Sequence, residues 1–229
     1  MIEKTAQQTG QQTSTEHTDR LTDHWWPRPG WRPGRTVLTW HLTYAGASEL
    51  HRLVAGYQEA LRGLPAMRPH PIRWLHSTVQ TVGYADETPR GALDAVITAV
   101  RDRLATVPAY EVEFGRPLVF SEAVVLRAEP AAPAQQVQAA IRAAIADALG
   151  PDAVGPDAVG APAPHWAPHV SVAYSSADAD AAPYVAAVEA VAGSTATVGI
   201  TEVTLIRQER RLAPEWCYRW TVVDSAPLA

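Results

Sequence analysis

The sequence predicts an α+β fold made of two duplicated halves, and three observations support this. Two tetrads of the pattern His-x-Ser/Thr-Val, at 76–79 and 169–172, fall in segments that read as β-strands. Each half of the chain contains a strand, a helix, a histidine-bearing strand, a second helix and further strand. With 229 residues, 47% of them hydrophobic, the chain can bury a substantial core. We therefore expect one domain with two lobes.

The chain begins with two segments that lack regular periodicity. Residues 1–20 are polar, so we expect a disordered tail there. Residues 24–34 contain three Trp, three Pro and two Gly, a composition that excludes a regular helix or a central strand. Extended chain held by buried indoles fits this Trp-rich segment, and so does a flap whose Trp and Arg side chains stack on a base or sugar.

Hydrophobic periodicity defines the remaining elements of the first half. Alternation at 36–44 predicts a strand, and an apolar stripe at 48–62 predicts a helix that starts with a serine N-cap. The first histidine strand spans 72–82, and a second apolar stripe predicts a helix at 89–104. Strand-like segments follow at 110–114, 117–120 and 123–127.

The second half repeats this order after the strand at 123–127. A helix is expected at 134–149, the second histidine strand at 168–174 and another helix at 181–191. Two further strands close the chain, at 196–207 and 216–223.

A Pro- and Gly-rich loop at 150–164 separates the helix from the second histidine strand. It carries a tandem Gly-Pro-Asp-Ala-Val repeat, which is typical of a flexible loop that tolerates insertion. Its position just before His169 places it where it could overhang the site. Within one domain at 21–229, we expect the first lobe mainly at 35–120 and the second mainly at 121–224.

Composition excludes several classes of protein. A net charge of −5 argues against a protein that coats long nucleic acid. The single cysteine, Cys217, excludes an internal disulfide and a cysteine-based metal site. The sequence has no apolar run of about 18 residues and no secretory signal, so we expect a cytoplasmic protein without a membrane partner.

The two tetrads carry the chemistry. Alternation on a strand places His76 with Thr78 on one face, and His169 with Ser171 on one face. A core would favour Val or Ile there, because a buried imidazole or hydroxyl without a partner costs about 1–3 kcal/mol. Two histidines around one phosphoryl centre can act as general base and general acid, while the hydroxyls donate to nonbridging oxygens. This scheme needs neither a metal nor another cofactor.

Four other residues are candidate substrate contacts, although a structural or surface role fits each of them as well. Gln80 falls on the expected face of the first tetrad, and His41 lies on a strand that should neighbour it. Arg207 could supply charge to a phosphate, and Trp166 could stack on a base. Tyr174, out of phase with the second tetrad on a regular strand, is expected in the core.

Other catalytic motifs are weak or absent. His165 and His169 are four residues apart, but the neighbouring prolines oppose the helix that would align them on a metal. The sequence has no phosphate-binding Gly-rich loop and no Gly-x-Ser-x-Gly elbow.

The two tetrads, with the duplicated halves around them, resemble the two-histidine phosphoesterase superfamily, and within it the bacterial 2'-5' RNA ligase-like proteins and cyclic phosphodiesterases. The likeness covers about 36–223. It implies a bilobal fold with two antiparallel sheets around a central groove and helices outside. It also implies that His76 and His169 are catalytic and that Thr78 and Ser171 bind the substrate phosphate.

The resemblance implies metal-independent opening of 2',3'-cyclic phosphates, on RNA 3' ends or on a small nucleotide, by a protein we expect to be a monomer. For hydrolysis to a 2'-phosphate we favour His169 as the base that activates water and His76 as the acid that protonates the leaving ribose oxygen, although the sequence does not distinguish the two histidines. Two alternatives remain in view. One is a noncatalytic module that binds RNA ends or nucleotides, and the other is 2'-5' RNA ligation, the reverse reaction at the same site.

Overall fold

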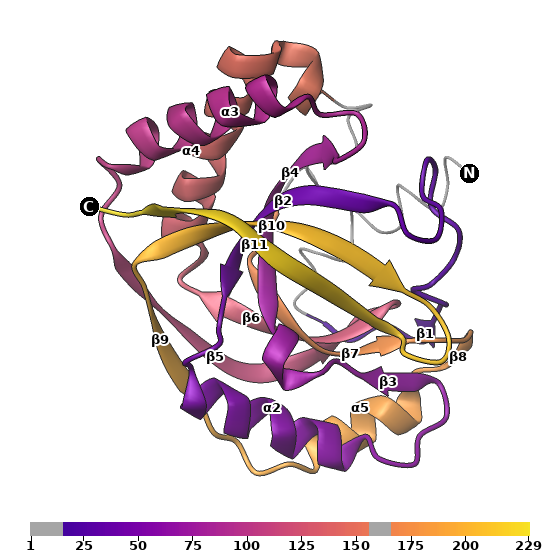
Figure 1. The fold of residues 1–229 in the computed structure, drawn as a ribbon. Coiled ribbons are helices and arrows are strands. Elements are labelled where there is room, and N and C mark those ends of the chain that lie inside the picture. The colour runs from indigo at the N-terminus through magenta and orange to yellow at the C-terminus, as the bar shows by residue number, and fades with distance from the viewer. Residues whose placement is uncertain (1–15, 156–165) are drawn as a thin grey trace.

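The computed structural model describes residues 16–155 and 166–229, and within them the chain forms two large antiparallel sheets (Figure 1). The first sheet has the order β11-β10-β2-β4, comprising Cys217–Pro227, Glu202–Arg211, Thr36–Thr43 and His76–Tyr84. The second has the order β3-β7-β6-β5-β9, comprising Met67–Pro69, His169–Ser175, Ala123–Glu129, Tyr110–Val119 and Ala196–Ile200. The predicted α+β fold with two antiparallel sheets is confirmed.

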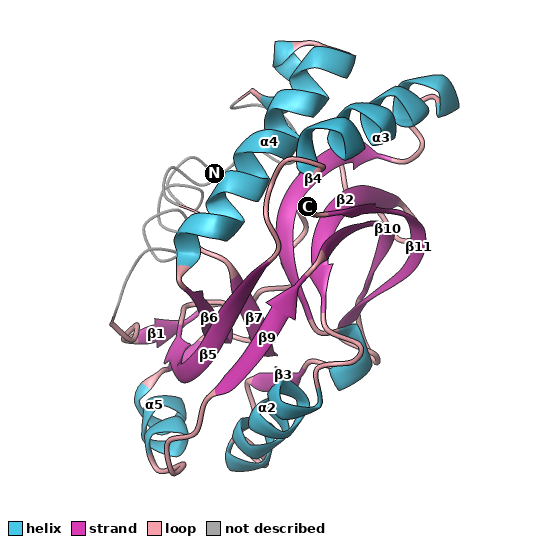
Figure 2. Ribbon diagram, turned by 90° about the vertical axis from the view of Figure 1, so that its left-hand side faces the viewer, coloured by secondary structure: helices cyan, strands magenta, loops and turns pink. Residues whose placement is uncertain are grey.

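Two pairs of helices lie at opposite ends of the molecule (Figures 1 and 2). One pair is α3 (Arg90–Leu104) with α4 (Ala131–Leu149), and the other is α2 (Ser48–Ala60) with α5 (Ala182–Glu189). Each helix buries the apolar stripe that its periodicity predicts. On α3 this stripe comprises Leu93, Val96, Val100 and Leu104. The predicted serine N-cap is wrong, because Ser48 is the first helical residue and Ala47 precedes it without a side-chain hydrogen bond. No helix in the described ranges is long and apolar enough to cross a membrane.

The boundary between the sheets does not follow the expected boundary between the lobes. Strands β10 and β11, from the second half, complete the sheet that holds His76. Strands β3 and β5, from the first half, complete the sheet that holds His169. The strand expected at 196–207 is in fact two strands that join different sheets and part at Thr201. A two-stranded sheet alone cannot bury an apolar face in water. Each sheet is therefore stabilised by strands that come from the other half of the chain.

The N-terminal part of the chain is tied to this body. The backbone N–H of Thr18 donates to the carbonyl of Val119, and β1 (Arg20–Leu21) pairs with β8 (Ala179–Asp180). The ordered chain therefore begins before Leu21. Residues 1–15 of the expected tail and residues 156–165 of the expected loop lie outside the described ranges. The loop's start is described as a short 3-10 helix, Pro151–Val154.

Two β-bulges change which side chains share a face. On β4, Thr78 pairs with His41 and Gln80 pairs with Trp40, so Val79 is the extra residue. The side-chain amide of Gln138 on α4 donates to the Val79 carbonyl at 2.9 Å. The backbone acceptor of the bulged residue is therefore hydrogen-bonded. The alternation is shifted after the bulge, and Gln80 lies on the face opposite Thr78.

The second bulge is on β7. Ser171 pairs with Val125 and Ala173 pairs with Val124, so Val172 is the extra residue. The shift places Tyr174 on the same face as Ser171. The expectation that Tyr174 is out of phase with the second tetrad is therefore wrong, because it assumed an uninterrupted strand.

We predict that Gln138→Ala lowers the free energy of unfolding by about 1–2 kcal/mol, because the part-buried Val79 carbonyl loses its side-chain donor. Urea denaturation would show a lower midpoint with an unchanged slope. Gln136→Ala is the matched control, since Gln136 is exposed on the same helix. Equal stability of the two variants would contradict a stabilising role for Gln138.

Candidate active site

The two tetrad histidines are held in the same way. Nδ1 of His76 lies 2.8 Å from the carbonyl oxygen of Trp74, and Nδ1 of His169 lies 3.0 Å from that of Ala167. A carbonyl can only accept, so each Nδ1 carries a proton in the neutral ring and donates to the carbonyl two residues earlier. Neither Nε2 has a hydrogen-bonding partner among the described residues. Each imidazole thus keeps one nitrogen available to a bound molecule.

The two tetrad hydroxyls also have defined neighbours. Thr78 is exposed, and its Oγ1 lies 3.2 Å from Nε2 of His41. Ser171 is buried, and its hydroxyl is within hydrogen-bonding reach of the hydroxyl of Tyr174. Each hydroxyl therefore lies beside a polar aromatic side chain of its own sheet, His41 for Thr78 and Tyr174 for Ser171.

Ser77 joins the two tetrads. Its Oγ donates to the backbone carbonyl of His169 at 2.7 Å and lies 2.8 Å from the hydroxyl of Tyr44. Since the single Ser77 proton is used on the carbonyl, the Tyr44 hydroxyl is the donor in the second bond. Ser77 is completely buried, so a direct hydrogen bond links β4 of one sheet to β7 of the other.

Burial weakens the basicity of both catalytic candidates. It lowers the pKa of His76 to about 4, and the nearby His169 contributes in the same direction. It also lowers the pKa of His169, with a further contribution from the charge of Arg127. The Ser77 bond to the His169 carbonyl brings the two histidine strands together, and the lowered pKa values leave both imidazoles neutral in the free protein near pH 7.

Aromatic rings enclose the first tetrad. The ring of His41 stacks on that of His76, with centroids 4.4 Å apart and planes within 2° of parallel. Trp220 of β11 stands edge-on to His76, with ring centroids 5.0 Å apart, and the ring centroids of Trp74 and Trp220 are 4.7 Å apart. Tyr218 is two residues before Trp220 and lies on the same strand face. The first sheet is curled (Figure 2), and its edge strand β11 brings Trp220 against His76.

The Trp-rich segment lies against Tyr174, which neighbours the second tetrad on β7. Nδ1 of His24 donates to Glu122 at 3.0 Å, and Nε2 accepts from the Tyr218 hydroxyl at 2.8 Å. The His24 ring stacks on Tyr174 at 4.3 Å. Arg210 fixes the segment by donating to the carbonyls of His24 and Trp26.

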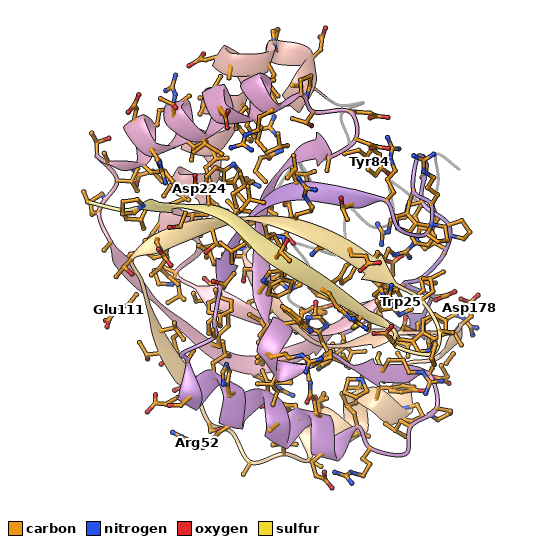
Figure 3. The ribbon with its side chains drawn as sticks, viewed as in Figure 1. Trp25, Arg52, Tyr84, Glu111, Asp178 and Asp224 are labelled. Atoms are coloured by element: carbon orange, nitrogen blue, oxygen red, sulfur yellow. The ribbon has the colours of Figure 1, made fainter. Side chains whose placement is uncertain are left out.

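The indole of Trp25 is buried with Tyr174 and Tyr218, between the ends of the two sheets (Figure 3). Burial of Trp25 agrees with the expectation of a buried indole, but turns at 24–25, 29–30 and 33–34 show that the segment is not extended chain.

The structure brings only part of the expected set of substrate contacts to the site. His41 lies there but is completely buried, so its neighbours are protein groups. Gln80 is turned away by the bulge, and its Oε1 accepts from Arg142 of α4 at 3.2 Å. Arg207 pairs with Leu38 and is exposed on the face opposite His41. Trp166 is 9% exposed, and its carbonyl accepts from Gln135.

Several residues that shape the site were missed by sequence reasoning. Ser77 occupied the unspecified position of its tetrad, and nothing in the sequence predicted its bond to the other sheet. Arg127 pairs with His169 in register, and the signal was available, because it is the single charged side chain in the apolar run 123–128. His24 was hidden in a segment without periodicity. In the described ranges, no group of three or more His, Cys, Asp or Glu side chains is placed to hold a metal ion.

Comparison with known families agrees with this geometry. A family model described as the 2'-5' RNA ligase superfamily matches residues 47–212, which contain both tetrads. The chain belongs to the 2'-5' RNA ligase superfamily. This confirms the family that the tetrads predicted, and the Trp-rich segment precedes the matched residues.

Solved structures in the comparison share the fold at low sequence identity. TT0787 of Thermus thermophilus has a TM-score of 0.62 and 18% identity, over 84% of this chain and 97% of its own. E. coli LigT in its apo form has a TM-score of 0.59 and 15% identity, over 85% of this chain and 98% of its own. LigT complexed with 3'-AMP has a TM-score of 0.57 and 16% identity, with the same coverage. No curated protein sequence matches this superfamily member.

We predict that the protein loses stability steeply below pH 6.5. Burial lowers the pKa of five histidines in the folded state, so protons bind the unfolded chain more readily and favour unfolding. These residues are His24, His41, His70, His76 and His169. Between its pKa in the unfolded chain and its pKa in the folded protein, each histidine lowers the free energy of unfolding by about 1.4 kcal/mol for every pH unit of acidification. Thermal melts at pH 7, 6 and 5 measure this, and a constant melting temperature would contradict it.

We predict that Ser77→Ala destabilises the protein by about 2–3 kcal/mol, because the His169 carbonyl and the Tyr44 hydroxyl lose a buried partner. Denaturant titration measures the loss. Ser194→Ala, at an exposed position, is the control and should change stability by less than about 0.5 kcal/mol. If both variants are equally stable, the bond between the sheets contributes nothing.

Proposed function

We propose that the protein opens 2',3'-cyclic phosphates, on RNA 3' ends or on small nucleotides, by hydrolysis that uses two histidines. The observation that carries this proposal is the matched pair of imidazoles. Each donates Nδ1–H to a carbonyl and leaves Nε2 without a partner among the described residues, on two strands that the Ser77 hydroxyl joins directly. That arrangement suits two proton transfers at one phosphorus atom.

In the proposed reaction, Nε2 of His169 takes a proton from water while the water oxygen forms a bond to phosphorus. The bond from phosphorus to one ribose oxygen breaks, and Nε2 of His76 gives that oxygen its proton. The product is a phosphomonoester with one free hydroxyl. Since a nearby negative charge raises the pKa of an imidazole, binding of the anionic phosphate favours the protonated form of His76 that this step requires.

The hydroxyls and one cation stabilise the phosphate. Thr78 and Ser171 donate to the nonbridging oxygens, where charge develops in the transition state. Arg127 pairs with His169 in register and adds positive charge beside it. The LigT structures with 3'-AMP, NADP+ and ATP support a nucleotide as the occupant of this fold.

We predict that His76→Ala and His169→Ala each lower turnover of a 2',3'-cyclic mononucleotide by about 10²–10⁴-fold, because each removes one proton-transfer group. Turnover is followed by phosphomonoester formation in EDTA, which should leave the wild-type rate unchanged. Arg207→Ala is the control and should remain within about threefold of wild type, since Arg207 lies outside the site.

Absence of wild-type turnover, or undiminished turnover in both histidine variants, would contradict the proposed catalysis. Binding of a nonhydrolysable cyclic-phosphate analogue without turnover would instead favour a noncatalytic binding module. Loss of turnover in EDTA would contradict the metal-independent scheme.

A further inference from the structure

His41 is a buried imidazole that the proposed chemistry does not use. Its side chain is completely buried, its ring stacks on His76, and its Nε2 lies 3.2 Å from Oγ1 of Thr78. Trp220 stands edge-on to His41 with centroids 6.0 Å apart. His41 therefore touches both residues of the first tetrad to which the proposed function gives a role, and no exposed surface remains through which it could touch a substrate.

The position of the proton on His41 can be argued from its two nitrogens. Burial, with the nearby His76 and His70, lowers the pKa of His41 well below its ordinary value, so the ring is neutral and carries one proton. Nδ1 is buried without a hydrogen-bonding partner in the described residues. A proton there would leave a buried donor unpaired, whereas a proton on Nε2 can donate to Thr78 and leaves only an acceptor unpaired. The Nε2–H form is the less costly one.

This form decides what the Thr78 hydroxyl can do. A hydroxyl has one proton and two lone pairs. If Nε2–H of His41 donates to Oγ1, the Thr78 proton is not used on His41 and remains available on the exposed side of the residue. If Nε2 were the acceptor instead, the same proton would point into the protein and could not reach a phosphate.

We propose that His41 is a positioning residue that directs the hydroxyl proton of Thr78 toward the substrate phosphate and fixes the His76 ring by stacking. This inference rests on the proposed function. It makes the first tetrad a unit of three residues, in which an imidazole outside the tetrad sets the polarity of the phosphate-binding hydroxyl. The Thr78 proton is directed at a phosphate oxygen, which can only accept a hydrogen bond. A ligand without such an acceptor therefore gains no affinity from His41.

Two substitutions of His41 separate its two contributions in the assay with a 2',3'-cyclic mononucleotide. His41→Phe keeps a ring against His76 but removes the N–H, while His41→Gln keeps an amide donor and removes the stacking. We expect His41→Phe to lower kcat about 10–100-fold, as Thr78→Val does, and the double variant to be no slower than either one. We expect His41→Gln to recover part of the loss seen in His41→Phe. Thr81→Val is the matched control, since the Thr81 hydroxyl donates to Thr39 and not to a histidine.

A direct readout does not depend on turnover. ¹⁵N NMR of histidine-labelled protein reports which imidazole nitrogen carries the proton, and the signal lost in His41→Phe belongs to His41. We expect protonated Nε2, and protonated Nδ1 would overturn the proposal. Full kcat in folded His41→Phe, or losses that simply multiply in the double variant, would also overturn it. If the wild-type protein shows no turnover, the proposed function fails, and the NMR result still decides the arrangement of His41 and Thr78.

Discussion

The hydrogen bond from the Ser77 hydroxyl to the backbone carbonyl of His169 joins the two tetrads directly. The tetrads belong to different sheets, so no ladder of backbone hydrogen bonds fixes their separation. A buried hydroxyl between them sets the backbone of one histidine against the strand of the other. Tyr44, the residue that follows β2, donates to this hydroxyl and so fixes its orientation. Proton transfer at one phosphorus atom requires both imidazoles in one geometry, and this bond helps to maintain that geometry.

Around this bond the two tetrads are built alike. Each imidazole is fixed by a carbonyl two residues earlier, and each hydroxyl lies beside a polar aromatic side chain, His41 in one case and Tyr174 in the other. A bulge follows each hydroxyl by one position, at Val79 and Val172. The bulges have different consequences, because the first turns Gln80 away from the site and the second turns Tyr174 toward it. The two halves therefore share the geometry of the tetrads and differ in the side chains that surround them.

The Trp-rich segment gives this member of the superfamily a wall that lies outside the region matched by the family model. His24 connects Glu122, beside the second sheet, to Tyr218 of the first sheet, and Arg210 holds the segment by its carbonyls. The neutral His24 can accept from Tyr218 because burial lowers its pKa to about 4. The same burial makes the segment sensitive to acid, so the wall and the histidine pair should lose stability over the same pH range.

The sequence alone determined the class of fold and the residues on which the proposed chemistry rests. Period-two alternation and the repeated tetrads identified His76, Thr78, His169 and Ser171, because a strand displays every second residue on one face. It also determined most helices, whose apolar stripes recur every three to four residues. The tertiary structure decided which strands share a sheet, since strand pairing joins residues more than one hundred positions apart, such as Thr39 with Ile206. It alone decided the positions of Gln80 and Tyr174, because a bulge shifts the alternation on which a sequence prediction depends. It also decided the surroundings of Ser77 and His41, because their partners lie on other strands.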